Sequence, residues 1–280
     1  MKKKLIIDAG STKMEWVMME GGHLIRRFVT SGFNPNYAGP EKLKTILLHE
    51  FPMDLESPDS IAYYGTGCGS ETNCAMVEGC LRSRFTDAEI YVSHDLMGAA
   101  VALFGQGRGI ACILGTGANS CLYKDGKILD KAVSLGYLVG DEGSGCYIGR
   151  KLVRSYFYGL MPNDLRALFE AKYQLDLRSF IDRVYHQPEA SKYLAGFTRF
   201  AGEYKDHPFV RQLVKECLDD FIDVFVMRYQ DCRELPIGFV GSVAYYLHDL
   251  LKECMEKEGV MMSEVMRSPM DGLIRYFSVD

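Results

Sequence analysis

The feature that most constrains the fold is an internal repeat. Two stretches of the chain pass in the same order through an apolar strand, a glycine turn, a second strand, a tight turn and a third strand. The first copy covers residues 4–29 and the second covers residues 109–129. A repeat of this kind predicts two similar domains, each with a glycine loop of a size that suits a phosphate group.

The order of the other elements predicts an α/β fold. In the first half, short apolar strands at 61–64 and 89–93 alternate with helical patterns, which favours parallel pairing through crossover helices. The second copy is followed by a mainly helical stretch and one more buried strand. We therefore predict an N-terminal domain of residues 1–106, with a C-terminal helix of about 268–280 packing back on it. Residues 107–267 are predicted to form a second domain with a helical insertion.

Composition limits the partners of the chain. Its 280 residues are 48% hydrophobic and 25% charged, which is typical of a globular protein with a substantial core. A net charge of −5 argues against nucleic-acid binding, because phosphate backbones require a basic surface. No apolar run has the length of a membrane span and no signal-peptide core follows the N-terminus, so we expect a cytoplasmic protein without a membrane partner.

The nine cysteines include no C-x-x-C pair and are expected to be reduced thiols.

The first glycine turn carries candidate residues for phosphate and metal binding. Asp8 ends a predicted strand and is followed by Gly10, Ser11, Thr12 and Lys13. A carboxylate at the end of a buried strand is costly unless it holds a metal or accepts hydrogen bonds. In a phosphate site, Asp8 would anchor Mg²⁺ through water, while the backbone of the turn and the Lys13 ammonium would meet phosphate oxygens. The alternative is that Asp8 only closes a turn through its side chain.

Two further glycine turns follow strands in the second half. Gly115-Thr116-Gly117 is the counterpart of the first turn, and Gly241-Ser242 joins a buried strand to a helix. Glycine lets oxygen atoms approach backbone N–H groups because no Cβ stands in the way. Two such turns from two domains can face one triphosphate, and the third suits the adenosine end of the nucleotide. Close packing of helix on strand is the alternative for the third turn.

Together these turns resemble the actin-like ATPase superfamily, which includes sugar kinases, actin and heat-shock chaperones. Within it, the chain is most similar to the BadF/BadG/BcrA/BcrD ATPase family and its N-acetylglucosamine kinase-like members. The motifs that carry the resemblance are Asp8-Ala9-Gly10-Ser11-Thr12-Lys13, Gly32-Phe33-Asn34, Ser93-His94-Asp95, Gly115-Thr116-Gly117-Ala118-Asn119-Ser120, Gly140-Asp141-Glu142-Gly143-Ser144-Gly145, Gly241-Ser242-Val243 and Ser268-Pro269-Met270-Asp271-Gly272-Leu273. The resemblance implies two ribonuclease H-like domains, each with a mixed five-stranded sheet flanked by helices, with the nucleotide in the cleft between them.

The resemblance also implies a catalytic residue. Asp95 matches the acid that acts in the amino-sugar kinases as general base on the attacking hydroxyl, a role that phosphoryl transfer requires. A helix N-cap before Leu96 is the alternative for Asp95, and the two roles are compatible. His94 is expected to be packed or hydrogen-bonded rather than catalytic, because the kinase mechanism needs no histidine.

Other matches fall at positions that bind sugar in the family. They are Asn34, Thr66, Gly67, Asp95, Thr116, Gly117 and Asp141. For Asn34 the alternative is a plain Asx turn before Pro35. Glu142 either supports Asp141 or begins the helix that starts near Ser144.

Two functions are consistent with these residues. The first is an ATP- and Mg²⁺-dependent kinase acting on an amino sugar, with N-acetylglucosamine preferred over N-acetylmuramate or glucosamine. The second is an ATPase that activates a partner enzyme, such as a 2-hydroxyacyl-CoA dehydratase, through an iron–sulfur cluster; Cys68 or Cys146 would then be a ligand. The acid at position 95 and the asparagine at position 34 favour the kinase. A homodimer is expected from the many aromatic residues of the helical second domain.

Overall fold

The computed structural model describes residues 1–279, which form two compact units. The first comprises Met1–Gln106 and the chain from Pro269 onward, and the second comprises Gly107–Ser268. The strands of unit 1 are β1 (Lys3–Ala9), β2 (Lys13–Glu20), β3 (His23–Ser31), β4 (Ser60–Gly65) and β5 (Glu89–His94). Those of unit 2 are β6 (Arg108–Leu114), β7 (Ala118–Lys124), β8 (Lys127–Lys131), β9 (Ile237–Val240) and β10 (Met262–Met266).

Both units contain a mixed five-stranded sheet with the same topology. The strand order is β3-β2-β1-β4-β5 in unit 1, and the equivalent order in unit 2 is β8-β7-β6-β9-β10. In each sheet the first three strands pair antiparallel and the last two pair parallel. The α/β fold with two mixed sheets is thereby confirmed, and the sequence repeat corresponds to a repeat of whole sheets.

Helices cover the sheet of unit 1. They are α1 (Pro40–His49), α2 (Glu71–Arg82), α3 (Asp95–Phe104) and α13 (Met270–Phe277). One face of the sheet packs on α1 and α2 around Trp16, which is fully buried and donates a 2.8 Å hydrogen bond to Thr30 Oγ1. The C-terminal helix α13 packs on α3, where a Cβ on Gly272 would lie 2.7 Å from the Cβ of Ala102. This close approach requires glycine at position 272.

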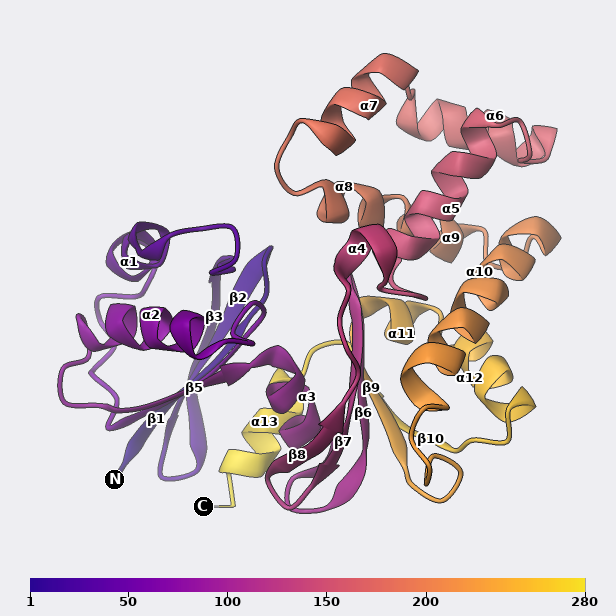
Figure 1. Cartoon of the computed structure of the whole chain (residues 1–280). Helices are drawn as coiled ribbons and strands as arrows, with labels where there is room; N and C mark the ends of the chain where they lie inside the picture. Colours follow the sequence, from indigo (N-terminus) through magenta and orange to yellow (C-terminus); the bar gives the residue numbers. More distant parts are fainter. Residues whose placement is uncertain (280) are drawn as a thin grey trace. The chain divides into compact units, whose positions relative to one another are not determined.

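Unit 2 carries the larger set of helices (Figure 1). They are α4 (Gly136–Val139), α5 (Gly145–Phe157), α6 (Asn163–Tyr173), α7 (Leu177–Tyr185), α8 (Ala190–Gly196), α9 (Thr198–Glu203), α10 (Pro208–Phe221), α11 (Ser242–Tyr246) and α12 (His248–Lys257), with one π-helical turn, η1 (Ile222–Val226), after α10. A core rich in Phe joins α5, α9 and α10 to one face of the sheet. None of the helices in residues 1–279 combines the length and apolar character needed to cross a membrane.

The sequence pattern also predicts one helix at 245–257 and a continuous amphipathic helical stretch at 209–229, with no strand at 262–266, and the structure differs at all three. The helix expected at 245–257 is divided into α11 and α12 by Leu247, whose backbone lies outside the helical region at φ −105° and ψ 22°. The preceding pair of tyrosines has a modest helix propensity, so little opposes this break. The amphipathic stretch from Phe209 to Tyr229 leaves α-helical geometry at Ile222. Strand β10 was missed because it is an edge strand with mostly exposed side chains and no clear alternation.

Candidate active site

Asp8 lies at the carboxyl end of β1 among other acids. It pairs across the hairpin with Glu15 of β2. Burial raises the pKa of Asp8 to about 7; the negative charges of Asp95 and Glu15 add to this effect, and Lys13 opposes it. Because the ionised form of Asp8 is disfavoured, a cation nearby would be stabilising. A single carboxylate of this kind fits Mg²⁺ that is held mainly by water and phosphate oxygens.

The turn after Asp8 is held in place by the loop that follows β3. Gly10 N–H donates to Lys13 O at 3.0 Å, and Phe33 N–H donates to Gly10 O at 3.1 Å. The amide of Asn34 donates to Ser11 Oγ at 3.0 Å. Ser11, Thr12 and Lys13 are exposed, so the outer side of the turn is open to a ligand.

Asn34 connects this turn to the second predicted sugar-side loop. Its Oδ1 accepts the Asn36 N–H at 3.0 Å, so the Asx turn is present, and its side chain nevertheless contacts Ser11 as well. Gly67 has φ +81°, and a Cβ there would overlap Asn34 Oδ1. The structure therefore brings Ser11, Asn34 and Gly67 together.

Asp95 is the first residue of α3 and is not its N-cap. His94 is the N-cap, because its Nδ1 accepts the Met97 N–H at 3.2 Å, whereas Asp95 Oδ1 accepts the adjacent Leu96 N–H at 2.9 Å. The prediction that Asp95 is the N-cap of α3 is therefore wrong, because the N-cap is the preceding residue, His94. Burial raises the pKa of Asp95, and His94 and hydrogen bonds from Leu96 and Thr66 limit the rise. Asp95 also acts electrostatically on Asp8, so the two acids share one environment.

In unit 2 the Gly115-Thr116-Gly117 turn is anchored through its carbonyl groups. Gly145 N–H donates to Gly115 O at 2.8 Å, and Cys146 N–H donates to Thr116 O at 3.1 Å. These donors belong to the first turn of α5, which ties the turn to the segment that carries Asp141. Thr116 itself is exposed.

Asp141 lies against the same turn in a backbone conformation that is uncommon for aspartate. Its φ is +57° and its side chain is 9% exposed. A Cβ on Gly117 would lie 3.0 Å from Asp141 Oδ2. Burial raises the pKa of Asp141, the Ala118 N–H lowers it by hydrogen bonding, and the charge of Glu142 raises it again. Because such strain concentrates at functional sites, Asp141 is a strong candidate for ligand contact.

Glu142 does not begin the helix. Ser144 is the N-cap of α5, since its Oγ accepts the Tyr147 N–H at 3.2 Å.

Arg150 of α5 was not singled out from the sequence. Its Nη1 donates to Tyr137 O at 2.6 Å and its charge lowers the pKa of Asp141. No sequence pattern connects residues 137, 141 and 150, so only the fold could identify this arginine.

Gly241 brings its loop into contact with the Gly115 turn. It has φ +134°, and a Cβ there would overlap Leu114 O and lie 3.0 Å from Gly115 N. Its N–H donates to Met266 O at 2.9 Å. Close packing therefore accounts for this glycine, and the same packing places the exposed Ser242 next to the phosphate-sized turn.

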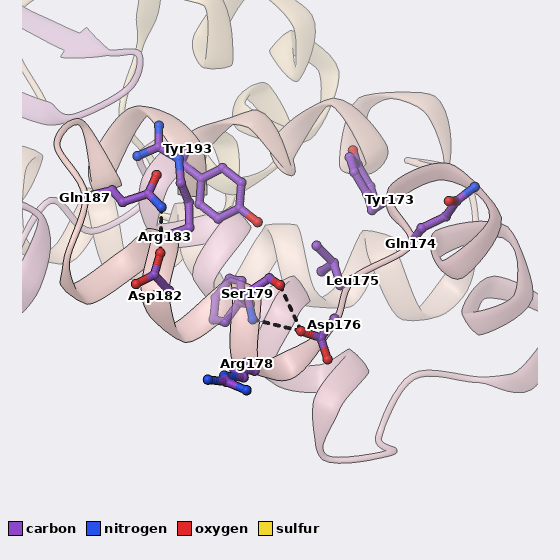
Figure 2. Close-up of a pocket in the computed structure, with 11 residues that line it drawn as sticks. Tyr173, Gln174, Leu175, Asp176, Arg178, Ser179, Asp182, Arg183, Gln187 and Tyr193 are labelled. Carbon is purple, nitrogen blue, oxygen red and sulfur yellow. Dashed lines mark hydrogen bonds between the residues drawn. The ribbon is translucent and has the colours of Figure 1, made fainter.

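One cavity lies elsewhere, within the helical insertion of unit 2. It has a volume of about 730 Å³ and is lined by residues of α6, α7 and the segments beside them. Figure 2 shows that its polar groups pair with one another: Asp176 with Ser179, and Asp182 with Gln187. None of the candidate site residues lines it. In residues 1–279, no group of three or more His, Cys, Asp or Glu side chains is arranged to hold a metal ion.

Comparison with known proteins identifies relatives over nearly the whole chain. A crystal structure from Porphyromonas gingivalis, provisionally named N-acetylglucosamine kinase, is 38% identical, with a TM-score of 0.94 and 99% of both chains covered. An N-acetylmuramic acid/N-acetylglucosamine kinase from Clostridium acetobutylicum is 26% identical over 280 residues, 89% of each chain.

A further structure, from Chromobacterium violaceum and also provisionally named N-acetylglucosamine kinase, has a TM-score of 0.68 at 16% identity over 99% of both chains, which supports the fold. No family model matches the chain. The identity and coverage of the Porphyromonas gingivalis relative confirm the resemblance to N-acetylglucosamine kinase-like proteins found in the sequence. The chain belongs to the N-acetylglucosamine kinase-like family of sugar kinases, phosphotransferases that share the actin-like ATPase fold.

Proposed function

We propose that this protein transfers the γ-phosphate of ATP to a hydroxyl of an amino sugar. The proposed substrate is N-acetylglucosamine, with N-acetylmuramate and glucosamine as alternatives. The observation that carries the proposal is the pair of half-buried acids, Asp8 and Asp95, in unit 1. Asp95 has a raised pKa and lies close enough to Asp8 to raise the pKa of that residue too. A general base works best when its pKa is near the working pH, and burial moves Asp95 in that direction.

The two acids have different parts in the proposed reaction. Asp95 accepts the proton of the attacking sugar hydroxyl, which is the one acid–base step that phosphoryl transfer needs. Asp8 would hold Mg²⁺, and the ion when bound would neutralise charge on the phosphate oxygens. Thr66 donates a hydrogen bond to Asp95 and so fixes the direction of its carboxylate.

The glycine turns bind the nucleotide in this proposal. The residues assigned to phosphate and nucleoside are Gly10, Ser11, Thr12, Lys13, Gly115, Thr116, Gly117, Gly241 and Ser242. Those assigned to the sugar are Asn34, Thr66, Gly67, Asp95, Thr116, Gly117 and Asp141. The exposed outer sides of the turns and the burial of Asp141 against Gly117 support these assignments.

The structure gives the iron–sulfur activator little support. The thiols of Cys68 and Cys146 are buried, and burial raises the pKa of each to about 12. Iron binds the thiolate form of cysteine, whereas burial keeps these two cysteines in the protonated thiol form. A colourless, iron-free protein after anaerobic purification is expected, and a brown, iron-containing protein would reverse this preference.

The direct test is an assay of ADP release with a panel of amino sugars, followed by mapping of the phosphorylated hydroxyl. Sugar-dependent ADP release with N-acetylglucosamine is the expected result. ADP release that is independent of every sugar would contradict the kinase proposal. The homodimer and the cytoplasmic location stay predictions, and light scattering of the purified protein tests the first.

A further inference from the structure

The one-turn helix α4 is not held in place by packing. None of the residues of Gly136–Val139 is buried, and Leu138 and Val139 are 68% and 71% exposed. The turn is closed by one hydrogen bond, from the Gly140 N–H to Gly136 O at 2.9 Å. A single helical turn is unfavourable by itself, because it fixes several backbone angles for one hydrogen bond. Contacts from outside α4 must therefore keep it in this conformation.

Arg150 of α5 supplies such contacts. Its Nη1 donates to Tyr137 O at 2.6 Å and to Leu138 O at 2.9 Å. These carbonyl groups belong to the C-terminal half of α4, where a helix leaves carbonyl oxygens without partners of its own and where a cation is favourable. One guanidinium nitrogen thus satisfies two of these oxygens.

The arginine is itself fixed by its neighbours. Its guanidinium lies 5.1 Å from the centre of the Tyr147 ring, and the Tyr147 hydroxyl donates to Asp220 Oδ2 of α10 at 2.8 Å. Helix α10 contributes to the hydrophobic core of unit 2. Helix α4 is therefore tied to that core through Arg150 and Tyr147.

The segment that Arg150 holds leads directly into Asp141. Only Gly140 separates α4 from Asp141, and a backbone at φ +57° persists in aspartate only where surrounding contacts enforce it. The charge of Arg150 lowers the pKa of Asp141, and the charge of Glu142 raises it. The nearby thiol of Cys146 is neutral, since burial raises its pKa to about 12.

Resting on the proposed sugar-kinase function, we propose that Arg150 is a positioning residue for sugar binding. It acts through Asp141 in two ways. Its hydrogen bonds hold the backbone of α4, so that the Asp141 carboxylate stays in place against Gly117. Its charge keeps that carboxylate in the ionised form, which accepts hydrogen bonds from sugar hydroxyls.

Steady-state kinetics of two variants test the positioning role. In Arg150→Met the KM for the sugar should rise about 10- to 100-fold, the range for loss of hydrogen bonds that involve a charged group. The kcat and the KM for ATP should change little, because Asp141 contacts the sugar before and during the reaction alike. Arg150→Lys keeps the charge and can donate to the same two carbonyl groups, so it should recover most of the sugar affinity.

A pH profile separates this role from a merely structural one. Burial already raises the pKa of Asp141, and without the Arg150 charge this pKa should rise further. Sugar binding needs the carboxylate and is lost as pH falls through this pKa. Calorimetry should therefore show that sugar affinity is lost at a higher pH in Arg150→Met than in the wild type. A ¹³C NMR titration of the Asp141 carboxyl group should show the same shift without turnover.

The matched control is Arg154→Met. Arg154 is an exposed arginine one turn further along α5, and it also lies near a tyrosine ring, that of Tyr158, at 5.9 Å. This variant should leave both KM values and the pH profile unchanged. An unchanged sugar KM in Arg150→Met, an equal rise in the KM for ATP, or an unshifted pH profile would overturn the positioning role while leaving the kinase proposal standing. Absence of sugar-dependent ADP release in the wild type would overturn both.

Discussion

The two units share a sheet topology but place different chemistry at the same edge. In unit 1, β1 delivers Asp8 two residues before Gly10; in unit 2, β6 delivers Ile113 two residues before Gly115. The pairing partners also differ, because Asp8 faces Glu15 while Ile113 faces Asn119. Unit 1 thus gathers carboxylates, and unit 2 offers backbone groups with a single buried acid, Asp141.

The repeat therefore determines the features that both units share, and the residues that differ between the two copies determine the chemistry of each unit. The shared topology produces a glycine turn at the carboxyl edge of each sheet, and such turns suit phosphates in either unit. Proton transfer and metal binding need acidic side chains, and Asp8 at the end of β1 has no acidic counterpart in unit 2, where Ile113 stands at the equivalent position. The comparison therefore predicts that changes in unit 1 affect catalysis most, whereas equivalent changes in unit 2 affect nucleotide and sugar binding or stability.

The largest expected effect is that of Asp95→Asn. Removing a general base typically lowers turnover by about 10²- to 10⁴-fold, and nucleotide affinity should be retained because the phosphate turns are untouched. Steady-state kinetics and calorimetry measure the two quantities. The matched control is Asp87→Asn, an exposed acid of the same unit, which should behave as the wild type. Near-normal phosphorylation by Asp95→Asn would remove this residue from the mechanism.

Next in size is a pair of glycine substitutions at equivalent positions of the two sheets. Gly241→Ala should lower the free energy of unfolding by about 3 kcal/mol or more, because alanine at φ +134° is strained and its Cβ overlaps backbone atoms of Leu114. In Gly65→Ala the atoms nearest the Cβ belong to the fully buried Tyr63 ring and not to backbone, so the core must repack around this ring and a loss of about 1–2 kcal/mol is expected.

Urea denaturation measures the difference between these variants. Gly259→Ala is the control for backbone strain alone, since Gly259 has φ +68° and open space around its Cβ position. It should cost about 1 kcal/mol. Equal losses for the variants at 241 and 65 would show that the contact with Leu114 is not tight in solution.

A smaller effect concerns pH. The pKa of Asp8 is about 7 in the folded protein, above its ordinary value of 3.8, so between these values the folded state holds a proton that the unfolded state has released. The contribution of Asp8 to stability therefore falls as pH rises from about 4 to 7. Asp8→Asn should be more stable than the wild type at pH 8, by about 1–3 kcal/mol, and this gain should vanish below pH 4.

The same variant should bind Mg-ATP more weakly, because the proposed metal anchor is lost. Stability and affinity thus change in opposite directions, which a merely structural aspartate would not produce. Denaturation at pH 4 and pH 8, with calorimetry at pH 8, provides the check. A stability difference that is the same at both pH values would show that Asp8 does not titrate in this range.

The sequence predicted the repeated elements well and the contacts between them poorly. The Gly10 and Gly115 turns could be recognised because each follows an apolar strand, and strand periodicity is local information. The contact of Asn34 with Gly67, and that of Arg150 with the segment before Asp141, join residues far apart in the chain. Such contacts depend on how strands and loops pack, and no spacing rule encodes them. The sequence prediction placed the N-cap of α3 one residue too late, at Asp95 instead of His94, because histidine is a less common N-cap residue than aspartate.

The smallest expected effect concerns one serine helix cap in each unit. Ser144 caps α5 and Ser70 caps α2, each by accepting a backbone N–H three residues on, at 3.2 Å and 3.3 Å. Replacing a serine cap by alanine costs about 0.5–2 kcal/mol. Ser144 is fully buried whereas Ser70 is exposed, so water can replace the lost bond only at position 70. Ser144→Ala should therefore lie at the upper end of this range and Ser70→Ala at the lower end, as measured by urea denaturation. The reverse order would show that the segment around Asp141 is held by its other contacts, such as that with Gly115, rather than by the cap.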